Sequence, residues 1–339
     1  MIHIDGSEGE GGGQVLRNAL ALSLITGTPF RIEKIRANRS RPGLMRQHVT
    51  AVEAACTIGG GECEELAVGA DALTFAPAKV VPGEHRFAVG TAGSTSLVLQ
   101  TILPPLMLAD APSRLVLEGG THNMAAPPFD FLARTFLPLL ERMGPRVSAR
   151  LVRHGFYPAG GGAIEVDIEP VKTLTRLDLM DRGALRRVEA RALLAGLPLV
   201  IAERELATVG KVLDWPEESR RMEQLPEKVG PGNVLLLEAE FEHVTEIATG
   251  FGQINVSAET VAQKASKRMA GYLASKAVAG PYLADQLLLP MALAGGGRFT
   301  TVKPSQHART AADIIRRFLD VEIRFDHRDD GCHVVEVTG

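Results

Sequence analysis

The sequence contains few cysteines. Only Cys56, Cys63 and Cys332 occur among its 339 residues, and no two of them have the CxxC spacing of a thiolate metal site. Their odd number also argues against the disulfide framework of a small secreted protein. We therefore expect reduced thiols and a cytoplasmic protein.

Excess charge of one sign and long hydrophobic runs are also missing. The chain has 37 Lys and Arg against 40 Asp and Glu, a formal net charge of -3, so any site for a polyanion must be local. The longest apolar stretches, Leu97–Ala109 and Leu287–Ala294, are shorter than the roughly 20 residues that span a bilayer. Residues 1–13 are acidic and glycine-rich, unlike a secretory signal. These features predict a soluble globular protein with no membrane partner.

The chain does have a repeated order of amphipathic helical runs and short β-branched runs. The order is helix, strand, helix, strand, strand, and it occurs three times, which predicts an α/β fold of internally repeated units, each a pair of helices on a sheet. The predicted helices are 14–25, 44–58, 94–108, 129–143, 282–293 and 306–318. The predicted strands are 30–35, 63–68, 72–75, 85–89, 114–117, 147–151, 163–168, 299–302, 322–325 and 333–337.

Residues 180–279 break this repeat. They carry separate strand and helix signals at 187–194, 200–212, 234–241 and 257–275, joined by polar stretches such as 214–232. We interpret this segment as a smaller α/β domain, inserted into a large domain that consists of residues 1–179 and 280–339.

The first chemical candidate is the glycine-rich turn GSEGEGGGQ at residues 6–14. Such a turn before a helix exposes backbone N–H groups to phosphate. Glu8 and Glu10 would repel phosphate unless a divalent cation bridges them, which suggests Mg²⁺ or Mn²⁺. A plain turn with solvated acidic side chains remains the alternative.

The second candidate is a basic cluster in residues 31–48, RIEKIRANRSRPGLMRQH. Arginine binds phosphate through its planar set of donors, and this local density on a net acidic chain indicates an anion site. A solvated basic surface is the alternative.

A third glycine-rich turn, HGFYPAGGG at 154–162, fits either a ligand loop or a tight connection between strands. Among the nine histidines, His307 has the most informative position. It lies in the first turn of a predicted helix that Ser305 can cap, where the helix dipole disfavours the charged imidazolium. A neutral, nucleophilic imidazole and an ordinary structural histidine are both possible. The residues alone thus indicate an α/β protein that binds phosphate.

These motifs resemble those of the RNA 3'-terminal phosphate cyclase family. The resemblance covers nearly the whole chain, and HGFYPAGGG is its most specific motif. In chain order the matching runs are DGSEGEGGGQVLR, IRANRSRPGLMRQH, GTAGSTSLVLQT, RHGFYPAGGG, YLADQLLLPMALAG and PSQH.

The resemblance implies a large domain of repeated α/β units, similar to the C-terminal domain of a bacterial translation initiation factor, with a smaller inserted domain. It implies ATP-dependent conversion of an RNA 3'-phosphate into a 2',3'-cyclic phosphodiester, through an adenylyl-histidine enzyme and an RNA adenylate, with release of AMP and pyrophosphate. ATP, RNA with a 3'-terminal phosphate, and Mg²⁺ or Mn²⁺ are the implied ligands, and a homodimer is plausible.

The resemblance also implies roles for individual residues. His307 matches the nucleophile, and Glu10 matches a metal ligand. The residues that match phosphate and RNA-end contacts are Arg17, Arg36, Arg39, Gln47 and His48. The residues that match the nucleotide site are Gln100, Pro127, Tyr282, Asp285 and Gln286, with Tyr282 and Pro127 on the two faces of adenine.

Two alternatives belong to other functional classes. One is a non-catalytic relative that binds RNA as a scaffold in ribosome assembly, although the presence of His307 disfavours it. The other is a transferase with an unrelated substrate on a similar repeated body, because a fold does not determine a function.

Overall fold

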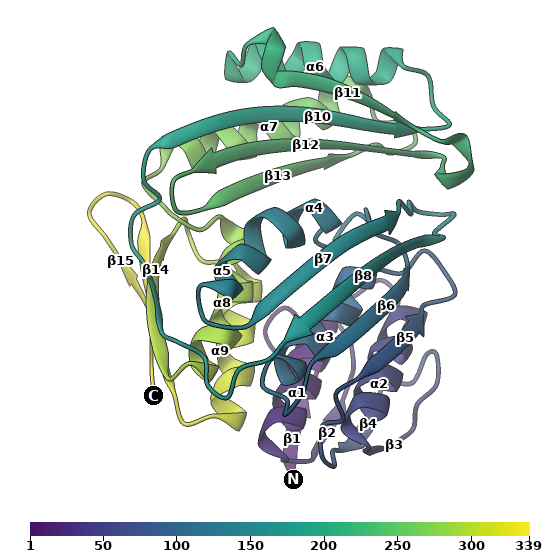
Figure 1. The fold of residues 1–339 in the computed structure, drawn as a ribbon, viewed down its shortest axis with the longest axis vertical. Helices are drawn as coiled ribbons and strands as arrows, with labels where there is room; N and C mark the ends of the chain where they lie inside the picture. The colour runs from purple at the N-terminus through teal and green to yellow at the C-terminus, as the bar shows by residue number, and fades with distance from the viewer.

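The computed structural model describes residues 1–339 and has the mixed α/β architecture that the sequence predicts. Figure 1 shows a lower part that contains both chain ends and an upper part formed by β10–β13 with α6 and α7. None of the helices combines the length and the apolar character needed to cross a membrane.

Three of the four sheets share one strand order. In each, the first two strands of the unit are parallel, and a helix precedes the second of them. Another helix then leads to an antiparallel hairpin. The last strand of this hairpin pairs with the second strand of the unit. The first unit has order β1-β2-β4-β3 and contains β1 (Ile2–Asp5), α1 (Gly13–Thr26), β2 (Phe30–Glu33), α2 (Arg46–Gly59), β3 (Glu62–Glu64) and β4 (Leu73–Ala76).

The second unit has order β5-β6-β8-β7. Its elements are β5 (Glu84–Ala88), α3 (Thr95–Leu106), β6 (Ser113–Gly119), α4 (Phe129–Phe131), a π-helical turn (Leu132–Phe136), α5 (Leu137–Glu141), β7 (Arg146–Arg153) and β8 (Gly162–Glu169). The predicted helix at 129–143 is therefore wrong in part, because a π turn interrupts it. Pro138 has no N–H to donate to the carbonyl four residues earlier, and Leu137 donates to Leu132, one residue further back than in an α-helix.

The third unit has order β9-β14-β16-β15. Its elements are β9 (Leu177–Leu179), α8 (Pro281–Leu293), β14 (Gly296–Thr301), α9 (Gln306–Phe318), β15 (Glu322–His327) and β16 (His333–Thr338). Each unit thus begins with a strand, β1, β5 or β9, that lies outside the predicted repeat of five elements. The sequence also predicts strands at 2–4 and 85–89, which match β1 and β5, so only β9 is missed. The short strand β9 contains only three residues, too few for an alternating pattern to be recognised.

The chain between β9 and α8 forms the fourth sheet, with order β11-β10-β12-β13. Its elements are β10 (Leu185–Ala195), α6 (Val200–Leu213), β11 (Arg220–Leu225), β12 (Gly232–Phe241), β13 (Thr245–Phe251) and α7 (Ala258–Ala274). The prediction of a connection over 214–232 is wrong at β11, whose sequence RRMEQL lies at the sheet edge and is mostly exposed. Strand β13 was also not predicted.

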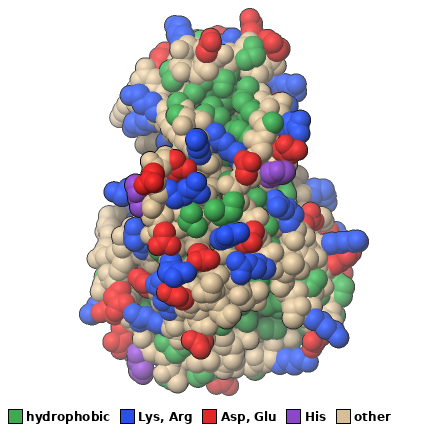
Figure 2. All heavy atoms as spheres, turned by 90° about the vertical axis from the view of Figure 1, so that its left-hand side faces the viewer, with side chains coloured by type: hydrophobic (Ala, Val, Ile, Leu, Met, Phe, Trp, Pro, Cys, Tyr) green, Lys and Arg blue, Asp and Glu red, His purple; other side chains and the backbone are tan.

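One continuous hydrophobic core extends through all four sheets, and its largest fully buried side chains include Phe30, Phe75 and Phe299. Figure 2 shows the molecule from the side, with basic and acidic side chains interspersed over the lower part and apolar side chains gathered on the upper part. On this face neither basic nor acidic side chains predominate, in keeping with the nearly balanced numbers of the two in the sequence.

Candidate functional site

A cavity of about 640 Å³ lies among α1, α3, α8 and the start of α9, and β13 and α7 complete its wall. All twelve residues selected from the sequence line this one cavity, although they come from distant parts of the chain. They are Glu10, Arg17, Arg36, Arg39, Gln47, His48, Gln100, Pro127, Tyr282, Asp285, Gln286 and His307.

The first glycine-rich turn packs too closely for larger side chains. A Cβ atom on Gly12 would lie 2.4 Å from both Arg39 Nη2 and Glu10 Oε1, and a Cβ atom on Gly13 would lie 2.4 Å from His48 Nε2. Glycine therefore allows the basic cluster and the acidic side chain to meet at the start of α1.

The two acidic side chains of this turn differ in environment. The Glu8 side chain is 54% exposed and pairs with Arg317, as expected for a solvated acid. The Glu10 side chain is only 6% exposed and forms an ion pair with Arg39. Its Oε1 atom is buried without a hydrogen-bond partner and lies 3.6 Å from His307 Nδ1. The alternative of a plain turn with solvated acids is thus wrong for Glu10.

The fit of a divalent cation rests on Glu10 alone. No group of three His, Cys, Asp or Glu side chains is arranged to hold a metal ion. The unpartnered Glu10 Oε1 is nevertheless a free oxygen ligand beside the nucleophile candidate. Mg²⁺ commonly uses one or two carboxylates together with water and substrate phosphates, so this donor set fits a cation that arrives with a phosphate ligand.

His307 lies in the first turn of α9, and Ser305 caps this helix as predicted, because its Oγ accepts a 3.1 Å hydrogen bond from the Ala308 N–H. Burial lowers the pKa of His307, and the positive charges of Arg39 and Arg17 act in the same direction, whereas Glu10 opposes them. The imidazole is therefore neutral near pH 7.

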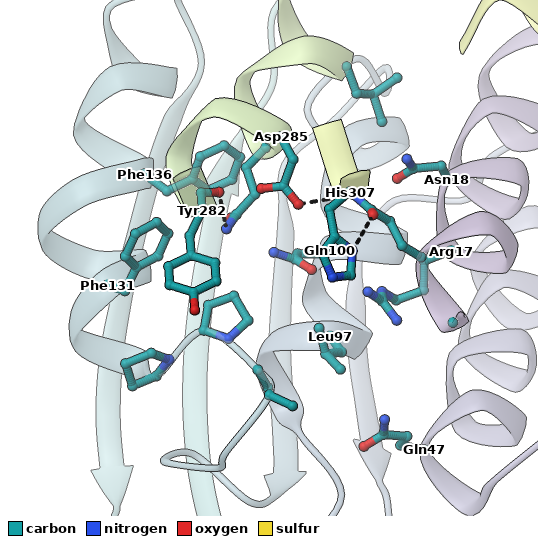
Figure 3. Close-up of a pocket in the computed structure, with 18 of the residues that line it drawn as sticks. Arg17, Asn18, Gln47, Leu97, Gln100, Phe131, Phe136, Tyr282, Asp285 and His307 are labelled. Atoms are coloured by element: carbon teal, nitrogen blue, oxygen red, sulfur yellow. Dashed lines mark hydrogen bonds between the residues drawn. The ribbon is translucent and has the colours of Figure 1, made fainter. Parts of the chain in front are cut away.

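Gln14 joins His307 to Asp285 and was not predicted. His307 Nδ1 lies 2.9 Å from Gln14 Oε1, and Gln14 Nε2 donates a 3.1 Å hydrogen bond to Asp285 Oδ2. In Figure 3 dashed lines start at the labelled side chains of His307 and Asp285. Burial raises the pKa of Asp285 to about 7, while Gln14 and Arg17 act in the opposite direction. Gln14 is the last residue of the glycine-rich turn GSEGEGGGQ, and this place in the motif is its only sequence signal.

Four arginines line the cavity, and three of them, Arg17, Arg36 and Arg39, come from the first unit. Burial lowers the pKa of Arg17 to about 10, which still leaves it charged at neutral pH. Arg39 pairs with Glu10. Arg36 instead donates 2.7 Å hydrogen bonds to the carbonyls of Arg41 and Gly43, so part of its role is to brace this loop.

His48 is a neutral hydrogen-bond donor rather than a cation. Burial lowers its pKa to about 3, and the charges of Arg17 and Arg36 contribute. Its Nδ1 accepts a 3.1 Å hydrogen bond from the Met45 N–H, so the remaining proton is on Nε2, the atom that lies closest to Gly13.

The polar residues Gln47 and Gln100 lie on neighbouring helices. Gln47 Oε1 accepts a 3.1 Å hydrogen bond from the Ser94 N–H at the start of α3, which leaves its amide N–H groups for a ligand. Gln100 projects from α3 into the region that contains His307 (Figure 3).

The opposite side of the cavity is more apolar. Figure 3 shows Tyr282 of α8 near Phe131 and Phe136, and Pro127 lines the same cavity. Gln286 Nε2 donates a 3.2 Å hydrogen bond to the Tyr282 carbonyl, and Gln286 Oε1 is buried without a partner.

Sequence reasoning also missed the contribution of β13 and α7 to this wall. Thr249, Phe251 and Arg268 line the cavity, and Arg268 donates to the Tyr282 hydroxyl at 3.4 Å and to the Thr249 carbonyl at 2.5 Å.

The third glycine-rich turn does not line the cavity. A Cβ atom on Gly155 would lie 2.4 Å from the Gly162 nitrogen, and Phe156 occupies the space beside Gly232. Of its two interpretations, this geometry supports a tight connection between β7 and β8.

Fold and cavity together define a mixed α/β protein whose site combines two neutral histidines, two buried acidic side chains and four arginines. The model of the RNA 3'-terminal phosphate cyclase family matches residues 8–325. The chain belongs to this family.

Three similar proteins are all named RNA 3'-terminal phosphate cyclase. The protein from Koribacter versatilis (strain Ellin345) is 56% identical over 338 residues, which cover 100% of this chain and 95% of that protein. The protein from Ectopseudomonas mendocina (strain ymp) is 52% identical over 323 residues, with coverage of 95% and 94%. The protein from Ralstonia nicotianae (strain ATCC BAA-1114 / GMI1000) is 51% identical over 334 residues, with coverage of 98% and 96%.

Proposed function

We propose that this protein uses ATP to convert an RNA 3'-terminal phosphate into a 2',3'-cyclic phosphodiester, with His307 as the nucleophile. The observation that carries this proposal is the neutral imidazole of His307 in a cavity that also contains Arg17, Arg39 and a buried carboxylate. A neutral imidazole has a free lone pair, and the cationic groups favour a polyphosphate beside it.

In the first step His307 attacks the α-phosphorus of ATP. The N–P bond forms as the bond to pyrophosphate breaks, and pyrophosphate leaves. The phosphoramidate product is a high-energy species, so the adenylyl group can be transferred again. An oxygen of the RNA 3'-phosphate then attacks the adenylyl phosphorus and releases the histidine. Finally the vicinal 2'-hydroxyl attacks the 3'-phosphorus, loses its proton, and AMP leaves.

The cationic wall would bind the phosphates. Arg17 and Arg39 supply charge to nonbridging oxygens, and Arg36 contributes the donors that are not used to brace its own loop. His48 and Gln47 add neutral N–H donors, which hold an oxygen without changing the net charge of the site.

The apolar side would bind the nucleoside. Tyr282 and Pro127 would enclose adenine, and a flat base gains stacking energy on an aromatic ring. Asp285 Oδ1 and Gln286 Oε1 are both buried without partners and are available to a bound nucleotide, and Gln100 lines the same region.

Glu10 would hold Mg²⁺ or Mn²⁺ through its unpartnered oxygen. When bound, the cation neutralises negative charge on the ATP phosphates. Arg39 pairs with Glu10, so the charge beside a ligand is set by both side chains together.

We also propose that residues 1–179 and 280–339 form the large catalytic domain, of repeated α/β units like those of the translation initiation factor domain, and that 180–279 is an inserted domain. The separate sheet β11-β10-β12-β13 supports this division. The scaffold alternative is not favoured, since all three relatives carry the name of the enzyme. A cytoplasmic location and a homodimer remain predictions.

The proposal is tested by incubating the protein with ATP and a divalent cation and measuring its intact mass. We expect a gain of one acid-labile adenylyl group that is lost when RNA with a 3'-phosphate is added. His307→Ala should form no adduct, whereas His327→Ala, a change at an exposed hairpin position, should behave like the unaltered protein. Full labelling of His307→Ala would refute the assignment of the nucleophile.

A further inference from the structure

Gln14 occupies a position between the nucleophile candidate and a buried acid. It is 8% exposed, and both ends of its amide group are engaged, Oε1 with His307 Nδ1 at 2.9 Å and Nε2 with Asp285 Oδ2 at 3.1 Å. Since α1 carries Gln14, α8 carries Asp285 and α9 carries His307, this short chain of hydrogen bonds also joins three helices.

The direction of these hydrogen bonds follows from the chemistry of Asp285. An ionised carboxylate only accepts hydrogen bonds, so the NH₂ end of the Gln14 amide must face it. The amide oxygen then faces His307 and requires a proton on Nδ1. A neutral imidazole has only one ring proton, so the lone pair is on Nε2.

We propose that Gln14, held in orientation by Asp285, is a positioning residue that fixes the Nδ1–H tautomer of His307 and so leaves Nε2 as the attacking atom. This inference rests on the proposed function, because it concerns the same nucleophile. When Nε2 bonds to phosphorus, the ring becomes an imidazolium without having to lose a proton first. The Nδ1–H then donates more strongly to Gln14 Oε1, since its donor is charged.

Glu10 Oε1, 3.6 Å from His307 Nδ1, is the other acceptor nearby. It favours the same tautomer, but its carboxylate already pairs with Arg39. The two acceptors can be distinguished by a change at Asp285, which alters the orientation of Gln14 and leaves Glu10 in place. The tautomer of His307 should respond to this change only if Gln14 fixes it.

The decisive measurement is the ¹⁵N spectrum of the His307 imidazole, assigned by comparison with His307→Ala. It is recorded without ATP at a pH above 7, where Asp285 is ionised. The unaltered protein should show a protonated Nδ1 and an unprotonated Nε2. Gln14→Leu removes the acceptor, and Asp285→Asn allows the Gln14 amide to turn its NH₂ group toward His307. Both variants should therefore show a mixture of the two tautomers.

The matching kinetic readout is the rate of adenylyl-adduct formation in a single turnover. Gln14→Leu should lower this rate about 10- to 100-fold, the size of effect seen when a metal-ligating histidine loses its hydrogen-bond partner, with a smaller change in the ATP concentration for half-maximal rate. The control is Gln263→Leu, the same substitution at an exposed position of α7 outside the cavity. It should change neither readout.

The proposal would be overturned if both variants kept a single Nδ1–H tautomer and rates within about twofold of the unaltered protein. Glu10 alone would then be the acceptor that fixes the tautomer of His307. An unaltered protein that forms no adduct would refute the proposed function instead. The spectrum would still decide the role of Gln14, since it requires no ATP.

Discussion

Two histidines line the same cavity and differ in the nitrogen that carries the proton. His48 accepts a hydrogen bond at Nδ1 from the Met45 backbone, so its Nε2–H is a donor. His307 faces the Gln14 oxygen at Nδ1. The chemistry of each ring therefore depends on its local hydrogen-bond partner, although burial lowers the pKa of both.

The depressed pKa of His48 predicts a loss of stability in acid. The unfolded chain binds a proton at this residue below pH 6.5, whereas the folded protein resists protonation down to a pKa of about 3. The unfolded state thus binds more protons in this interval, and the stabilisation that is complete above pH 6.5 is lost as the pH falls toward 3.

Urea unfolding at several pH values within this interval measures the effect. His48→Gln should reduce the slope of unfolding free energy against pH by at most about 1.4 kcal/mol per pH unit. His154, whose pKa burial lowers to about 4, contributes to the slope in both proteins, so their difference isolates His48. Identical slopes would contradict the prediction.

At this scale the motifs predicted residues that the fold brings to one cavity, while the role of each stays a prediction. Glu10 and His307 occur in distinctive local sequences, and all twelve selected residues line one cavity. Gln14 could not be predicted with them, because its role depends on partners 271 and 293 residues away in the chain. The bracing role of Arg36 likewise depends on carbonyls of its own loop, which a basic sequence pattern does not reveal.

At the scale of elements, helix N-termini position the site. The start of α1 lies against His48, and α9 begins beside His307. Serine side chains cap both α9 and α7, where Ser257 accepts a hydrogen bond from the Thr260 N–H. Of these two caps, only Ser305 lies beside a residue that lines the cavity, His307. Loss of each cap can therefore be compared for its effect on the site.

Ser305→Ala and Ser257→Ala should each lower the unfolding free energy by about 1 kcal/mol through loss of a helix cap. Only Ser305→Ala should also slow adenylyl-adduct formation, because it loosens the turn that holds His307. Denaturant unfolding and single-turnover labelling measure the two effects. Equal slowing by both variants would show that global destabilisation, and not the position of His307, is responsible.

Elements with strong apolar periodicity could be predicted, and those without it could not. Helix α6 begins and ends within one residue of its predicted range. Strand β11 escapes prediction because it is a polar edge strand, and the π turn because an α-helical pattern does not reveal how Pro138 changes hydrogen bonding.

At the scale of the whole molecule, the upper sheet and its helices also contribute to the cavity. Arg268 of α7 contacts the Tyr282 hydroxyl, and Glu246 of β13 accepts a 2.9 Å hydrogen bond from the Gly280 N–H that precedes α8. The two parts are further joined by ion pairs of Arg134 with Glu238 and Arg191 with Asp130.

Arg268→Met should therefore weaken nucleotide use, because it releases Tyr282 from its partner across the cavity. We expect the ATP concentration for half-maximal adduct formation to rise by roughly 10-fold, equivalent to the loss of about one hydrogen bond to a charged group. Lys267→Met, at the adjacent exposed position of α7, is the control. Titration of ATP against labelling measures both variants, and equal responses would exclude this role for Arg268.

The third sheet also has a consequence for the order of assembly during synthesis. Strand β9 pairs with β14, with Leu177 opposite Gly297. This pairing cannot form until the whole of β10 to α7 has been translated. Closing so long a loop is entropically costly, although the cost grows only slowly with length. The histidine that we assign as nucleophile follows β14, so the ribosome completes two full units before the reactive centre can form.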